Sequence, residues 1–135
     1  MDFFTAMDVS AQGLSTQRIR MNVAASNLAN VDSTSGDNGG AYRRRSVLVQ
    51  SVPDLRAPGV NGVIVKQIVA DATPGRQEWD PENVDADARG YVTYPNINPV
   101  TEMVDMITAS RAYEAGVTAL SSSVAMAERA LGIGR

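Results

Sequence analysis

The sequence contains no cysteine and no histidine. Without cysteine the chain forms no disulfide and does no thiol chemistry. Without histidine it lacks the commonest general base and the commonest zinc ligand of proteins. Aromatic residues make up only 5% of the chain, and alanine and valine supply much of its 44% hydrophobic content. Such a composition buries a thin apolar seam more easily than a thick globular core.

The net charge and the shortness of the hydrophobic runs argue against a nucleic-acid-binding protein and against a membrane-spanning one. The formal net charge is −3, so the chain lacks the basic surface that nucleic acid binding requires. No apolar run approaches the roughly 20 residues of a membrane-spanning helix. The N-terminus, Met1-Asp2-Phe3-Phe4-Thr5, has no basic region followed by an apolar segment. We therefore expect no cleavable secretion signal, and export by another route if the protein leaves the cytoplasm.

The last third of the chain carries the clearest periodic pattern. Over residues 98–131, apolar or small residues recur at alternating spacings of three and four, which is typical of a helix with one narrow coiled-coil seam. The seam residues are Met103, Met106, Ser110, Tyr113, Val117, Leu120, Val124, Ala127 and Leu131. Asn98 is a favourable N-cap, Pro99 suits the first helical position, and Gly132 and Gly134 are expected to end the helix. About 33 residues make a rod roughly 50 Å long, which needs a partner of similar length.

A second helix is predicted over residues 5–30, with Thr5 or Ser10 as its cap. Its seam, which Arg18 interrupts, consists of Met7, Ala11, Leu14, Met21, Ala25 and Leu28. The seam of the other helix is its expected partner. Apolar residues outside both seams favour several neighbours around each helical pair, and the alternative is a two-helix core covered by the middle of the chain.

The middle of the chain has turn and strand signals. Residues 32–41 are rich in Gly, Asp and Ser and predict a linker. Strands are predicted at residues 42–52, 60–70, 76–79 and 90–94. The expected fold is therefore mainly α, with a long antiparallel hairpin of the N- and C-terminal helices, like a coiled coil, and a short β-rich middle segment.

Two charged clusters interrupt this pattern. Residues 43–45 are three consecutive arginines, which either bind a phosphate or an acidic partner or lie solvated on an edge strand. The acidic cluster consists of Asp80, Glu82, Asp85 and Asp87. It lacks the spacing of a calcium loop and reads as a solvated turn. The alternative is an ion-pair contact with the arginines, within one chain or between chains.

Three asparagines lie in the first predicted helix, where asparagine is unusual because its side chain competes for backbone hydrogen bonds. Asn30 is expected to end the helix in a left-handed conformation. For Asn22 and Asn27 two readings stay open: exposure to solvent, or hydrogen bonding to an adjacent helix that sets the register.

Several segments resemble a known family. Residues 13–23, GLSTQRIRMNV, and residues 25–33, ASNLANVDS, resemble the N-terminal signature of bacterial flagellar rod and hook proteins. Residues 85–107, residues 110–115 and the ending 130–135 are similar to the C-terminal part of a rod member of this family. The resemblance covers nearly the whole chain and is weakest in the linker.

The resemblance implies a structural, non-enzymatic subunit of the proximal rod of the flagellar basal body, without catalytic residues, metal or cofactor. Such a subunit passes through the flagellar type III export apparatus and polymerises helically through its terminal helices, which transmits torque across the periplasm. The implied partners are other proximal-rod and distal-rod subunits, the hook–basal-body adaptor protein FliE and copies of the same chain, with no nucleic acid and no direct membrane span. The alternatives are a non-polymerising coiled-coil adaptor or export-linked binding protein and, less simply, a hydrolase that uses the acidic cluster.

The resemblance also divides the chain and marks its assembly interface. Residues 1–31 and 98–135 are expected to form a discontinuous helical rod-core domain, and residues 32–97 a linker and small β insert. The expected interface combines seam residues with matched signature positions. It consists of Leu14, Met21, Asn22, Asn27, Leu28, Asn30, Tyr94, Asn96, Asn98, Pro99, Met103, Met106, Arg111, Tyr113, Val117, Leu120, Val124 and Leu131.

Overall fold

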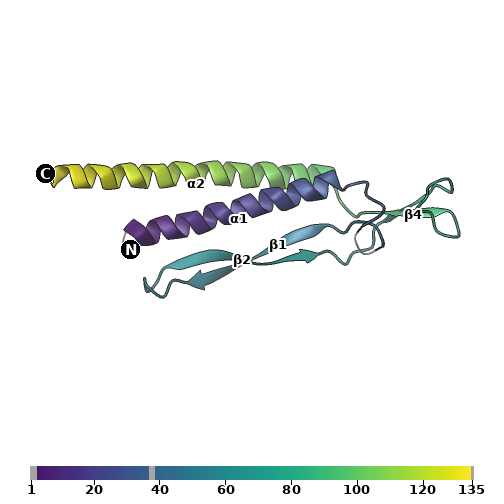
Figure 1. Cartoon of the computed structure of the whole chain (residues 1–135), viewed down its shortest axis with the longest axis horizontal. Helices are drawn as coiled ribbons and strands as arrows, with labels where there is room; N and C mark the ends of the chain where they lie inside the picture. Colours follow the sequence, from purple (N-terminus) through teal and green to yellow (C-terminus); the bar gives the residue numbers. More distant parts are fainter. Residues whose placement is uncertain (1–2, 37–38, 135) are drawn as a thin grey trace.

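Two long helices, α1 and α2, form the body of the protein (Figure 1). The computed structural model describes residues 3–36 and 39–134. Its elements in chain order are α1 (Phe3–Ala29), β1 (Arg45–Pro53), β2 (Asn61–Ala70), β3 (Arg76–Trp79), β4 (Tyr91–Tyr94) and α2 (Pro99–Ile133). The helices lie antiparallel, with both ends of the chain at one end of the molecule (Figure 1). The predicted mainly α fold with a small β insert is confirmed.

The start of α2 agrees with the sequence prediction. Asn98 has an extended backbone, and its side-chain oxygen accepts hydrogen bonds from the amides of Val100 and Thr101 at 3.0 and 3.4 Å. Pro99 follows as the first helical residue. Of the two glycines predicted to end α2, Gly134 is confirmed as the C-cap, with a φ of −81°, outside the left-handed region. The stop at Gly132 is wrong, because the helix continues to Ile133.

The predicted caps of α1 are wrong. The helix already begins at Phe3, so Thr5 lies inside it and is buried. Ser10 also lies inside the helix, and its hydroxyl donates to the carbonyl oxygen of Ala6 at 2.8 Å. Serine within a helix commonly bonds the carbonyl four residues back, which removes it as a cap.

The contact face of α2 is shifted from the predicted seam. The residues turned inward are Glu102, Met106, Ala109, Tyr113, Gly116, Leu120, Ser123 and Ala127, all buried or half-buried. The spacing of three and four is kept, but every second position moves back by one residue. Met103, Val117 and Leu131 are 41%, 44% and 77% exposed, so their predicted packing on the first helix is wrong.

Close approach of the backbones explains the shift. A Cβ atom added to Gly116 would lie 2.8 Å from Cδ2 of Leu14, so glycine is what admits the leucine at this point. Ala109, about two helical turns earlier on the same face, is fully buried. Small residues on the contact face let the helix axes approach, and the larger Val117 is left outside.

Helix α1 is covered on two sides (Figure 1). The β1–β2 hairpin lies along α1 on the side away from α2, and only α1 contacts both. This arrangement explains why the single predicted seam of α1 is wrong: Ala11 and Ala25 are exposed, whereas Thr16 and Ala24 are buried. A helix between two partners needs two contact faces.

The four predicted strands are confirmed, and they form two separate antiparallel pairs, β1–β2 and β3–β4. A bulge interrupts the first pair: Leu48 lies opposite Gln67 and Val49 opposite Val65, which leaves Lys66 without an opposing residue. The β3–β4 hairpin extends beyond the end of the helical pair (Figure 1). Within the described part of the chain, no helix is both long and apolar enough to cross a membrane.

Candidate assembly interface

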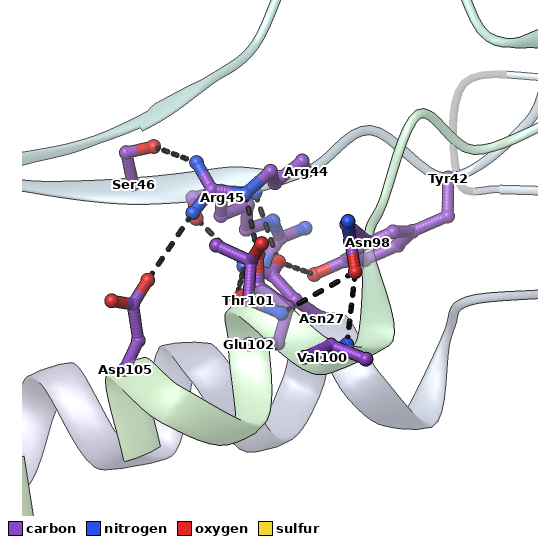
Figure 2. Close-up of polar contacts among 10 residues, drawn as sticks. All are labelled: Asn27, Tyr42, Arg44, Arg45, Ser46, Asn98, Val100, Thr101, Glu102 and Asp105. Atoms are coloured by element: carbon purple, nitrogen blue, oxygen red, sulfur yellow. Dashed lines mark hydrogen bonds and ion pairs between the residues drawn. The ribbon is translucent and has the colours of Figure 1, made fainter. Parts of the chain in front are cut away.

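Asn27 is the centre of a buried polar junction that joins α1, α2 and the start of β1 (Figure 2). We use "polar junction" for Asn27, Tyr42, Arg44, Arg45 and Glu102. Asn27 is only 1% exposed. Its amide nitrogen donates to the carbonyl oxygen of Arg45 at 2.8 Å and to Oε2 of Glu102 at 3.0 Å. Its oxygen accepts from the amide of Arg45 at 2.9 Å and from the hydroxyl of Tyr42 at 3.1 Å. All four hydrogen-bonding positions of the side-chain amide are therefore used.

Glu102 brings a charge into this junction. The carboxylate lies in the first turn of α2, where the helix dipole favours negative charge, and the residue is 1% exposed. Nε of Arg44 donates to its Oε1 at 2.5 Å, and other guanidinium nitrogens of Arg44 reach Oγ of Ser46 at 2.9 Å and Oδ2 of Asp105 at 3.5 Å (Figure 2). A buried charge needs a hydrogen-bonded partner. Arg44 therefore links the insert to α2 through Glu102.

The three asparagines of α1 have different environments. Asn27 hydrogen-bonds to an adjacent helix, as one of the two readings predicted, and that helix belongs to the same chain. Asn22 is exposed. The predicted left-handed conformation of Asn30 is wrong, because no non-glycine residue among the described ones has a positive φ. Instead, the backbone amide of Asn30 donates to the carbonyl oxygens of Ser26 and Asn27, which tightens the last turn of the helix.

The arginine run is divided between inside and outside. Arg44 pairs with Glu102, Arg43 is exposed, and the guanidinium of Arg45 lies 5.6 Å from the ring centre of Tyr42. The predicted ion pair between these arginines and the acidic cluster of the same chain is wrong within the described residues. The acids of α2 lie nearer to Arg44, and Asp85 accepts instead from Thr34 of the linker at 2.7 Å.

The other predicted interface residues lie along the helices and at the start of α2. The half-buried ones are Leu14, Met21, Leu28, Tyr94, Met106, Tyr113, Leu120 and Val124. The exposed ones are Asn22, Asn96, Met103, Arg111, Val117 and Leu131, while Asn98 and Pro99 begin α2. Tyr94 also packs its ring 5.0 Å from the guanidinium of Arg76.

Sequence reasoning missed Glu102 and Gly116, and it named Arg44 only as part of the arginine run, without a partner in the chain. The signal for Glu102 was its place four residues after the cap Asn98, where an acid is common, but nothing local predicted its burial. Its partner Arg44 lies far away in the sequence. Acidic residues also form no group that suits a metal ion in the part of the chain that the structure describes.

Comparisons with known proteins agree with this architecture. The family profile described as "Flagella basal body rod protein" matches residues 7–36, and the one described as "Flagellar basal body rod FlgEFG protein C-terminal" matches residues 88–133. These two ranges contain most of α1 and all of α2, the two helices that meet at the polar junction.

Relatives that match along their full length identify the branch of this family to which the chain is similar. Three of them are all named flagellar basal-body rod protein FlgC. The relative from Aquifex aeolicus is 48% identical and the match covers 96% of this chain and 95% of the relative. Those from Bacillus subtilis and Salmonella typhimurium are 40% and 37% identical, with all of both chains covered. The chain therefore belongs to the FlgC family of flagellar basal-body rod proteins.

Proposed function

We propose that this chain polymerises helically through its terminal helices and that the polymer transmits torque across the periplasm as part of the proximal rod. The chain is a structural subunit of the flagellar basal-body rod and not an enzyme, as its family membership establishes. Rod proteins assemble with other rod components. Contacts with the adaptor protein FliE and with further copies of this chain belong to the proposal.

A largely apolar and partly exposed column on α2, which we call the unused column, is the observation that carries this proposal. The column has a seven-residue spacing and consists of Met103, Ser110, Val117, Val124 and Leu131. It lies beside the face that α1 covers. Met103, Val117 and Leu131 are 41%, 44% and 77% exposed, whereas Ser110 and Val124 are half-buried at the edge of that face. A helix with two adjacent heptad seams has room for a second helix beside the first. The second seam therefore favours a neighbouring subunit.

The same surface widens near the start of α2. Val100, Val104 and Ile107 are 64%, 55% and 52% exposed within three turns of the helix. Scattered apolar residues on a surface need no explanation, whereas a contiguous group suggests a protein contact. This group adjoins the unused column at Met103, so the two form one continuous apolar face for a helical neighbour.

The polar junction gives the proposed subunit its stiffness. We divide the chain into a helical core of residues 1–31 and 98–135 and an insert of residues 32–97. Asn27 and Glu102 tie the insert to both helices at one point, and the guanidinium of Arg56 pairs with Asp8 near the other end of α1. The β1–β2 part of the insert is therefore attached along α1 at both of its ends, firmly at the polar junction and more weakly at the exposed Arg56–Asp8 pair, and we expect it to move with the helices as a torque-bearing subunit requires.

The expected interface residues then have two roles. Met103, Val117 and Leu131 face outward, so they are available to a neighbouring helix. Asn27 and Asn98 use their side chains within the chain, so they act on assembly by fixing the shape of the subunit.

The proposal is tested by placing a charge in the unused column. Val117→Asp should prevent the purified chain from assembling in sedimentation experiments and should abolish motility in a strain that lacks the native protein, because the carboxylate would be desolvated against a neighbour. Thr118→Asp is the matched control, since it adds the same charge one residue away on the exposed face. Normal assembly of the Val117→Asp chain would refute the proposal, and retained partner binding without assembly would favour the adaptor.

A further inference from the structure

Gln12 of α1 contacts the β1–β2 hairpin at a point far from the polar junction. Its side-chain oxygen accepts a hydrogen bond from the backbone amide of Val63 in β2 at 3.1 Å. The neighbouring Gly62 is buried, and a Cβ atom added to it would lie 2.0 Å from the same oxygen of Gln12. Glycine at position 62 therefore leaves the space that the Gln12 side chain needs to reach the strand.

The polar junction contains the same kind of contact. The side-chain amide of Asn27 donates to the carbonyl oxygen of Arg45 and accepts from its backbone amide, as a residue of a neighbouring strand would. Helix α1 thus presents two carboxamides to the backbone of the hairpin, that of Asn27 to β1 and that of Gln12 to β2. Backbone groups on the outer edges of a strand pair lack partners within the pair, and these side chains supply them.

The two contacts have matching spacings on the helix and on the hairpin. Gln12 and Asn27 are 15 residues apart in one continuous helix, which corresponds to roughly 22 Å. Val63 lies opposite Ser51, six residues beyond Arg45 in β1, which corresponds to roughly 20 Å of strand. Both contacts are therefore made together when the hairpin lies along α1, as it does in Figure 1.

The bulge in the hairpin lies between these two contacts. It leaves Lys66 without an opposing residue, and a bulge increases the twist of a strand pair. The twist turns the hairpin about its long axis, so that α1 meets the edge of β1 at Asn27 and the edge of β2 at Gln12.

The other contact near the turn of the hairpin is weaker. Arg56 pairs with Asp8, but their side chains are 72% and 43% exposed, and exposed ion pairs hold a segment only loosely. A hairpin held at the polar junction alone can swing about that point, whereas a second contact far along α1 removes this freedom. We propose that Gln12 is a positioning residue, which fixes the turn end of the hairpin on α1 and thereby sets the angle between the hairpin and the helical pair.

The importance of this angle rests on the proposed function, in which the insert moves with the helices under torque. The contact itself does not depend on assembly, because all of its residues belong to one chain.

Hydrogen exchange of single backbone amides tests the contact, followed by NMR at a chain concentration at which the helices are formed. Gln12→Ala should make the amide of Val63 exchange about five- to tenfold faster, because it removes the acceptor. The amide of Arg45 should be unaffected, since Asn27 holds it. Gln12→Glu keeps an acceptor oxygen and should retain most of the protection. Arg56→Ala is the matched control, because it removes the neighbouring contact and should leave Val63 protected.

Gly62→Ala tests the same contact from the side of the strand. Gly62 is not among the glycines with a positive φ, so alanine fits its backbone. Its methyl group should displace the Gln12 side chain and speed the exchange of Val63 as much as Gln12→Ala does. The two substitutions together should add nothing further, because they break one contact.

The possible failures are distinguishable. Unchanged exchange of Val63 in the Gln12→Ala chain would overturn the inference, and so would equal acceleration at Val63 and Arg45, because the substitution would then loosen the whole fold. Motility of a strain that carries Gln12→Ala in place of the native protein tests the consequence. Faster exchange of Val63 with normal swimming would support the Gln12 contact but overturn the stiffness that the proposed function requires of the insert.

Discussion

Replacing Glu102 by alanine tests how strongly the polar junction holds the three elements together. The substitution removes the acceptor 3.0 Å from the amide nitrogen of Asn27 and the carboxylate 2.5 Å from Nε of Arg44. A buried donor left without an acceptor costs about 1–3 kcal/mol. Loss of the ion pair adds less than the about 3–5 kcal/mol known for fully buried pairs, because the Arg44 side chain is 27% exposed and keeps Asp105 and Ser46.

We therefore expect Glu102→Ala to lower the free energy of unfolding by about 3 kcal/mol, roughly a hundredfold change in the folded-to-unfolded ratio. Urea unfolding followed by circular dichroism measures it, at a chain concentration at which the helices are fully formed. Glu102→Gln keeps an acceptor without the charge, so we expect about half of that loss.

Asp105→Ala is the matched control for this measurement. It removes the other carboxylate near Arg44, but that contact is 3.5 Å long and the Asp105 side chain is 45% exposed. An exposed pair of this kind contributes about 0–1 kcal/mol. Equal stability of the Glu102→Ala and Asp105→Ala chains would refute the assignment of Glu102 as the residue that holds the junction.

Three further predictions concern packing, folding and pH. Gly116→Leu should lower the free energy of unfolding by about 1–3 kcal/mol through overlap with Leu14, measured by urea unfolding. A dilute chain should show weak helical circular dichroism that rises with concentration, since the second seam stays bare in a monomer; cooperative unfolding independent of concentration would contradict this. Hydrogen bonds from the backbone amides of Tyr91 and Arg89 lower the pKa of Asp87. The stabilisation of its turn should therefore be present above the ordinary carboxyl pKa and be lost as the pH falls through the lowered pKa of Asp87. The amide chemical shifts of Arg89 and Tyr91 measure this loss, and a transition at the ordinary carboxyl pKa would contradict the prediction.

Local sequence determined the elements of this fold. The Asn98–Pro99 start of α2 was predictable because capping uses only neighbouring residues. The four strands were predictable because proline and glycine turns separate their apolar runs. The end of α2 was predictable only in part: Gly134 is the cap, as expected, but Gly132 lies inside the helix, since a single glycine weakens a helix without stopping it.

Tertiary structure alone decided which face of each helix is buried. Large apolar residues such as Val117 make the better seam by hydrophobicity, yet Gly116 faces α1 because it admits Leu14. Glu102 is buried because Arg44, distant in sequence, brings its charge partner. Hydrophobic periodicity records how often apolar residues recur, but close backbone approach and charge pairing depend on residues that only the folded chain brings together.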